Sequence, residues 1–180
     1  LQATFAVEAH MEQLADATGG VDGWVSMEVS PLLASDTSGS IEAAARIYQQ
    51  ASRPNLFVKI PGTPEGIPAI EESIFAGVPI NVTLLFSREQ YLAAAEAYLR
   101  GIERRIAAGL SADVASVASV FISRWDVSVA QMALKMAPNT LGIAIGQRCY
   151  KAYCDFIASP RYQRVLNNGG RPQRLLFAST

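Results

Sequence analysis

Segments with strand character and segments with helix character alternate along this chain, and that order constrains the fold more than any single motif. Five short, mostly apolar runs are typical of strands: residues 24–29, 55–61, 80–86, 114–122 and 175–177. Segments with helical spacing or capping chemistry occupy residues 41–51, 64–76, 88–108, 127–136 and 141–157. Strands that are separated by helices favour parallel pairing, because a parallel pair needs a crossover connection. We therefore predict an α/β fold with about five parallel strands and intervening helices.

The strands carry few charges, and we expect Glu28, Lys59, Asn81 and Arg124 to lie at or just past the carboxyl ends of the strands. In a (β/α)8 barrel the active site is built at that end of the strands. An open doubly wound sheet is the alternative, but no glycine-rich phosphate loop follows any of the runs. Five strands are too few to close an eight-stranded barrel, so residues 1–180 are expected to form a single, incomplete TIM-barrel domain.

Both ends of the chain fall inside the predicted pattern of elements. The sequence begins at Leu1 in a helical pattern and stops at Thr180, directly after a strand-like run. We therefore expect a fragment whose remaining strands come from sequence on either side.

Composition excludes several classes of protein. Half of the 180 residues are hydrophobic, 17% are charged and the net charge is −1, which excludes a disordered chain. Acidic and basic residues are interspersed, so we expect no nucleic-acid partner and no membrane-surface partner. Cys149 and Cys154 fit no zinc or redox spacing and are expected to be reduced thiols in a cytoplasmic protein. The one histidine, His10, lies in a helical segment, which argues against a histidine-containing metal site.

Lys59 is the most unusual residue in the strand-like runs, because Leu56, Phe57 and Val58 precede it and Ile60 follows it. A lysine in such a run either reaches solvent at the strand end or is buried at a functional position. Burial favours the neutral amine, since the ammonium form loses hydration, and a neutral amine is the nucleophile that attacks a ketone to form an imine.

Polar residues in the neighbouring runs leave two interpretations open. Glu28 is either a carboxylate that acts on a catalytic water or an ion-pair partner of Lys59. Asn81 and Thr83 alternate along one strand and so share a face. They either line a barrel beside Lys59 or are ordinary polar residues near a strand start.

Ser119 and Arg124 bracket the end of the fourth run. An arginine at this position can bind a phosphate with two parallel hydrogen bonds. The alternative is a surface arginine that pairs with Asp126.

Taken together, the runs resemble consecutive strand motifs of the transaldolase family. The matching segments are VSMEVSP at 25–31, VKIPGT at 58–63, INVTLLFS at 80–87, SVASVFISR at 116–124 and RPQRLLFAST at 171–180. Each motif is weak by itself, but five in order cover nearly the whole chain.

The resemblance implies a class I aldolase mechanism without metal or cofactor, acting on sugar phosphates of the pentose phosphate pathway. In this family pattern, Lys59 matches the Schiff-base lysine, Glu28 the glutamate that works through a bound water, and Thr83 the threonine that holds this water. Asn81 matches the asparagine that binds the sugar-derived unit.

The same resemblance assigns the phosphate end of the substrate. Ser119 and Arg124 match the serine and arginine near the substrate, with Arg124 on the phosphate, and Ser179 lies in the region that completes that site. Gly62 stands where many members carry alanine. The acid/base aspartate and the asparagine of the family's first two strands, and its eighth strand, match nothing in this chain, so we expect the 180 residues alone to be inactive.

Three alternatives remain open at this stage. The chain could be a fructose-6-phosphate aldolase-like enzyme that releases the three-carbon unit instead of transferring it. It could be the transaldolase part of a fusion with glucose-6-phosphate isomerase. It could also be a non-catalytic barrel fragment that binds a partner or forms a homo-oligomer through an open sheet edge.

Overall fold

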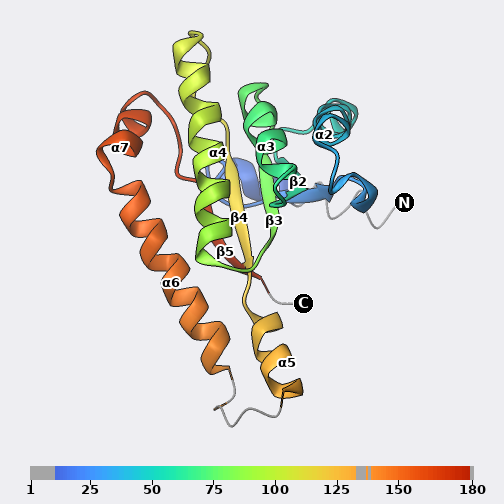
Figure 1. Ribbon diagram of the computed structural model, residues 1–180. Helices are drawn as coiled ribbons and strands as arrows, with labels where there is room; N and C mark the ends of the chain where they lie inside the picture. Colours follow the sequence, from blue (N-terminus) through green and yellow to red (C-terminus); the bar gives the residue numbers. More distant parts are fainter. Residues whose placement is uncertain (1–10, 133–136, 138, 179–180) are drawn as a thin grey trace.

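The computed structural model describes residues 11–132, 137 and 139–178. In this part of the chain five strands form one parallel sheet, paired in sequence order (Figure 1). The strands are β1 (Val25–Glu28), β2 (Leu56–Pro61), β3 (Ile80–Leu85), β4 (Ser116–Phe121) and β5 (Arg174–Ala178). The predicted α/β fold is confirmed, and five parallel strands with crossover helices are consistent with a partial TIM barrel.

The helices follow the strands along the chain and pack against one another on one side of the sheet. They are a short 3-10 helix η1 (Pro31–Leu33), α2 (Thr37–Ala51), α3 (Gly66–Phe75), α4 (Arg88–Ala107), α5 (Ser123–Gln131), α6 (Thr140–Ile157) and α7 (Pro160–Asn167). Figure 1 shows α3 and α4 side by side, with α2 next to α3 and with α6 and α7 next to α4. None of the described helices is long and apolar enough to cross a lipid bilayer.

The hydrophobic core lies between the sheet and these helices. Alternate strand residues point into it, and their side chains are completely buried: Val58, Ile60, Ile80, Val82, Ala118 and Val120. The helix residues that meet them include Ile70 and Ile74 of α3 and Tyr98 and Leu99 of α4. Because this face of the sheet is filled by apolar packing, the alternate residues of each strand must face the other way.

Tyr98 links the core to the start of β5. Its hydroxyl lies 3.0 Å from the carbonyl oxygen of Val114 and 2.9 Å from that of Arg171. Burial raises the pKa of Tyr98 well above its usual range, so this hydroxyl remains a hydrogen-bond donor. The contact holds together the segments that lead into β4 and β5.

Side chains cap the first turns of α2 and α4. The side chain of Asp36 accepts a hydrogen bond from the amide of Gly39 at 2.9 Å and caps α2. Ser87 accepts from the amide of Gln90 at 3.1 Å and caps α4. The Gln90 side chain accepts a hydrogen bond from the amide of Phe86 at 2.7 Å, one residue before the amide of Ser87 that a regular capping box would use.

The predicted start of α3 at Pro64 is wrong, because the helix begins at Gly66. The hydroxyl of Thr63 accepts a hydrogen bond from the amide of Gly66 at 3.0 Å and donates to the carbonyl of Ala34 at 2.7 Å. An added Cβ on Gly66 would lie 1.9 Å from the carbonyl oxygen of Pro61. The helix therefore starts where a glycine allows its backbone to approach the end of β2.

The region after β4 also differs from the prediction. Helix α5 begins at Ser123, directly after the strand, and not at residue 127. The indole of Trp125 donates to the carbonyl oxygen of Phe86 at 2.7 Å, which fixes the first turn of α5 to the end of β3. Helix α7 was not predicted, although Ser159 caps it and Pro160 occupies its first turn.

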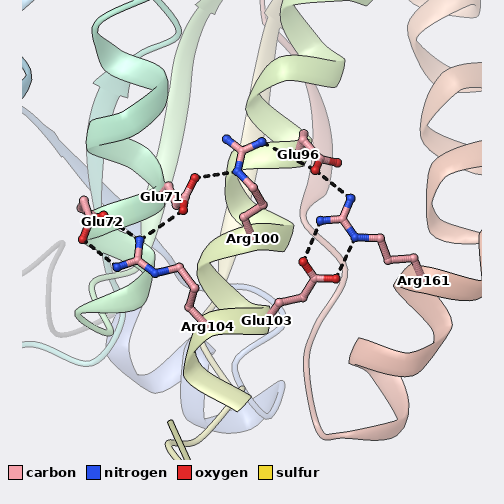
Figure 2. A network of polar contacts seen from close by, with 7 residues as sticks. All are labelled: Glu71, Glu72, Glu96, Arg100, Glu103, Arg104 and Arg161. Carbon is pink, nitrogen blue, oxygen red and sulfur yellow. Dashed lines mark hydrogen bonds and ion pairs between the residues drawn. The ribbon is translucent and has the colours of Figure 1, made fainter. Parts of the chain in front are cut away.

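An ion-pair network covers the outer surface of the helical layer and connects α3, α4 and α7 (Figure 2). Arg104 of α4 binds Glu72 of α3 through two nitrogens, at 2.6 and 3.1 Å, and these contacts lower the pKa of Glu72. Arg161 of α7 binds Glu103 through two nitrogens and Glu96 through one, at 2.6 to 2.7 Å. Two-point contacts of arginine with carboxylates are directional, so the network fixes how the helices lie relative to one another.

Candidate active site

The register of the sheet places the predicted polar residues on one face. Glu28 pairs with Lys59, and Lys59 pairs with Asn81 on the next strand. Paired residues of neighbouring parallel strands point to the same side, and so do residues two positions apart. Thr83 therefore shares this face, as does Ser119, because Val117 is the partner of Asn81. This is the face opposite the helices, and we call it the inner face.

Lys59 and Glu28 form an ion pair on this face. The Lys59 Nζ atom lies 3.5 Å from Oε2 of Glu28, and the two side chains are 26% and 50% exposed. The lysine is thus neither fully buried nor isolated from charge, and the ion-pair alternative for Glu28 is present in the structure. The Lys59 side chain is partly exposed to solvent on the inner face, which is the open side of the sheet.

Asn81 is held from both ends by hydroxyl groups. Its Nδ2 donates to Oγ of Ser26 at 3.2 Å, and its Oδ1 accepts from Oγ of Ser119 at 2.8 Å. Asn81 and Ser119 are buried, while Ser26 is exposed on the edge strand β1. The three side chains form a row across the inner face beside Lys59. Ser26 was not predicted; its position two residues before Glu28 was the available signal.

Thr83 lies at the point where the regular pairing of β3 ends. It is 1% exposed, and its carbonyl oxygen accepts a hydrogen bond from the amide of Gly62 at 2.8 Å. Val82 pairs with Ala118 but Leu85 pairs with Val120, so a three-residue step on β3 matches a two-residue step on β4.

The extra residue in this β-bulge is Leu84, whose φ of 57° lies in the left-handed region and whose side chain is 43% exposed. Without the bulge, Leu85 would point to the inner face with Asn81 and Thr83. With the bulge, Leu85 is completely buried in the core. The bulge therefore ends the polar face at Thr83.

Arg124 is the second residue of α5 and is exposed at the carboxyl end of β4. The predicted alternative partner, Asp126, accepts a hydrogen bond from the amide of Gly142 at 3.1 Å and so ties α5 to the start of α6. Ser179 and His10 lie outside the described residues. Within the described part of the chain, no group of three or more His, Cys, Asp or Glu side chains could hold a metal ion.

The arrangement offers an amine, a carboxylate, an amide and three hydroxyls on one face. A carbonyl compound that approaches Lys59 from the open side would meet Glu28 and Asn81 on either side of the amine. Such a face can bind a hydroxylated ketone through hydrogen bonds and can present an amine nucleophile to its carbonyl carbon.

Comparison with known proteins agrees with this geometry. Residues 3–168 match the sequence profile of the family described as transaldolase/fructose-6-phosphate aldolase. The chain is 44% identical to the transaldolase of Acidothermus cellulolyticus over 172 residues, which covers 92% of this chain and 46% of that protein. It is 42% identical to the transaldolase of Thiobacillus denitrificans over 175 residues, covering 93% and 49%. It is 40% identical to transaldolase 2 of Nostoc punctiforme over 182 residues, covering 92% and 48%.

The chain spans about half the length of these curated relatives. The family match extends over most of the chain and includes the four strands that carry Glu28, Lys59, Asn81 and Ser119. On this match the chain belongs to the transaldolase/fructose-6-phosphate aldolase family.

Proposed function

We propose that this chain carries the Schiff-base half of a transaldolase site. The observation that supports the proposal most directly is the position of Lys59, which lies between Glu28 and Asn81 in the register of the sheet and is open to solvent on one side. The substrates would be ketose phosphates, sedoheptulose 7-phosphate or fructose 6-phosphate, as donors and an aldose phosphate as acceptor.

The proposed reaction begins when the Lys59 ammonium passes a proton to Glu28, and the resulting neutral amine attacks the ketone carbon. Loss of water from the adduct gives a protonated imine at C2 of the ketose. The imine accepts the electrons of the C3–C4 bond while the C4 hydroxyl gives up its proton and becomes an aldehyde. That bond breaks to release an aldose phosphate, and the three-carbon dihydroxyacetone unit stays on Lys59 as an enamine. The enamine attacks the carbonyl carbon of the acceptor aldehyde, and water then hydrolyses the new imine to release the product and the free amine.

The neighbouring side chains have separate proposed roles. Glu28 lies 3.5 Å from the Lys59 amine, close enough to exchange protons with it through a water molecule held by Thr83. Asn81 would hydrogen-bond the hydroxyls of the three-carbon unit. Ser119 would lie near the substrate beside Asn81. Arg124, together with Ser179, would bind the phosphate at the carboxyl-end rim.

A further proton donor and acceptor is required for cleavage of the carbon–carbon bond. The family's acid/base aspartate matches no residue here, so we propose that the 180 residues form the imine but do not turn over. A turnover rate of the isolated chain near that of full-length relatives would refute this part of the proposal.

Borohydride reduction with fructose 6-phosphate tests the imine. Reduction converts an imine into a stable amine, so mass spectrometry of the intact chain should show a covalent sugar-derived adduct. Lys59→Arg should abolish the adduct. Lys151→Arg is the matched control, because Lys151 is an exposed lysine on α6 that pairs with Asp155 at 2.8 Å. An adduct that persists in Lys59→Arg would contradict the proposal.

A fructose-6-phosphate aldolase is the second candidate, because the description of the matching family includes that activity. An aldolase releases dihydroxyacetone from fructose 6-phosphate without an acceptor, whereas a transaldolase needs an acceptor aldehyde for turnover. Release of free dihydroxyacetone by a protein that contains this chain with the rest of its barrel would favour the aldolase.

The transaldolase proposal includes a place in the pentose phosphate pathway and a cytoplasmic location. It also includes assembly into a homo-oligomer.

A further inference from the structure

We infer that Ser26 is a positioning residue of this site, and this inference rests on the function proposed above. Ser26 lies on β1 and accepts a hydrogen bond from Nδ2 of Asn81 on β3, at 3.2 Å. These strands are not neighbours, because β2 lies between them. The bond therefore joins strands that share no backbone pairing.

The route of this bond explains its effect on Lys59. Ser26 pairs with Phe57, and Lys59, two residues further along β2, pairs with both Glu28 and Asn81. The Ser26–Asn81 bond thus crosses the inner face of β2 between Phe57 and Lys59. Backbones two strands apart are separated by roughly 10 Å in a flat sheet, so the bond needs a sheet that curves toward its inner face.

The bond has two consequences for the chemistry. First, Asn81 is anchored at both ends of its amide, by Ser26 and by Ser119, so its second N–H and remaining lone pair have a fixed direction toward a ligand. Second, β1 is a four-residue edge strand with three exposed residues, and Ser26 ties it to the sheet two residues before Glu28. The bond therefore sets the position of both Glu28 and Asn81 relative to the Lys59 amine.

Two substitutions of equal shape test whether the hydroxyl is responsible. Thr and Val both suit an edge strand and have nearly the same volume, but only Thr keeps the hydroxyl. We expect Ser26→Val to form the borohydride-trapped adduct about five- to tenfold more slowly than the wild type, the effect of one lost hydrogen bond. The rate of adduct formation by Ser26→Thr should stay within about twofold of the wild-type rate, because the threonine hydroxyl can accept the same hydrogen bond. Ser38→Ala, which loses a 3.0 Å hydrogen bond to Asp36 away from the site, is the control and should react like the wild type.

Three results would overturn the inference. A Ser26→Val protein that reacts as fast as the wild type would show that the hydroxyl does not position the site. Equal loss in the Val and Thr variants would show that side-chain volume matters and the hydrogen bond does not. Absence of any adduct on wild-type Lys59 would refute the proposed function and this inference with it.

A measurement that needs no substrate tests the Ser26–Asn81 hydrogen bond separately from the proposed chemistry. In urea unfolding of Ser26→Ala, Asn81→Ala and the double variant, the two residues should be coupled by about fivefold in the unfolding equilibrium constant. Coupling with no adduct would mean that the proposed chemistry is wrong although the bond exists. Additive effects would mean that the bond itself contributes nothing.

Discussion

Substitution of Gly66 by alanine should destabilise the fold at the loop that follows β2, the strand that carries Lys59. Gly66 is the first residue of α3, and an added Cβ would lie 1.9 Å from the carbonyl oxygen of Pro61 and 3.0 Å from Oγ1 of Thr63. The nearer atom belongs to the backbone at the end of β2, so it cannot rotate out of the way as a flexible side chain would.

The expected magnitude combines two opposing effects. Overpacking against a fixed neighbour costs about 1–3 kcal/mol and sometimes more. Replacement of glycine by alanine in a helix returns about 0.5–1 kcal/mol. Because the close approach of 1.9 Å is to a backbone atom, the cost lies at the upper end of this range, about 3 kcal/mol. The net loss in the free energy of unfolding should therefore be about 2 kcal/mol, which lowers the melting temperature of a chain of this size by about 4–8 °C.

Thermal unfolding followed by circular dichroism is the assay, and Gly146→Ala is the matched control. Gly146 lies within α6, and its added Cβ would make an ordinary contact, 3.5 Å from the ring of Phe177. That variant should gain about 0.5–1 kcal/mol. A Gly66→Ala protein that melts at the wild-type temperature or above would refute the close approach between α3 and the end of β2.

Three further substitutions test other parts of the fold. Arg161→Ala removes the contacts that tie α7 to Glu96 and Glu103. Urea unfolding should show that the free energy of unfolding falls by about 1 kcal/mol and that this loss is smaller in 1 M salt. A loss that does not change with salt would argue against the ion pairs. Tyr98→Phe removes a buried hydroxyl from two carbonyl oxygens and should cost about 1–2 kcal/mol in the same assay; an unchanged midpoint would contradict this bond. Ser52 has a left-handed backbone of φ 50° at the end of α2, and Ser52→Gly removes the steric cost of that conformation. The free energy of unfolding should rise by up to about 1 kcal/mol, and a lower melting temperature would contradict this geometry.

The alternation of elements predicted the fold class because each strand and helix has its own local pattern. Residues 55–61 are a nearly continuous apolar run, and β2 is buried over most of its length. The exact starts of α3 and α5 could not be predicted in this way. They depend on contacts between segments far apart in the sequence, such as Trp125 with Phe86, that no local pattern encodes.

The candidate site was predictable to a similar extent. Period-two alternation placed Asn81 and Thr83 on one face, and the register of the sheet places them with Lys59. The bulge at Leu84 was not predictable, because Leu84 has no feature of a residue that prefers positive φ. The role of Ser26 also depends on curvature of the sheet, which brings together strands that are not neighbours.

The most direct test of the central claim is the location of the trapped imine. After borohydride reduction with fructose 6-phosphate and proteolysis, tandem mass spectrometry should place the adduct on the peptide that contains Lys59 and leave Lys151 unmodified. An adduct distributed over several amines, or confined to a site other than Lys59, would contradict the account.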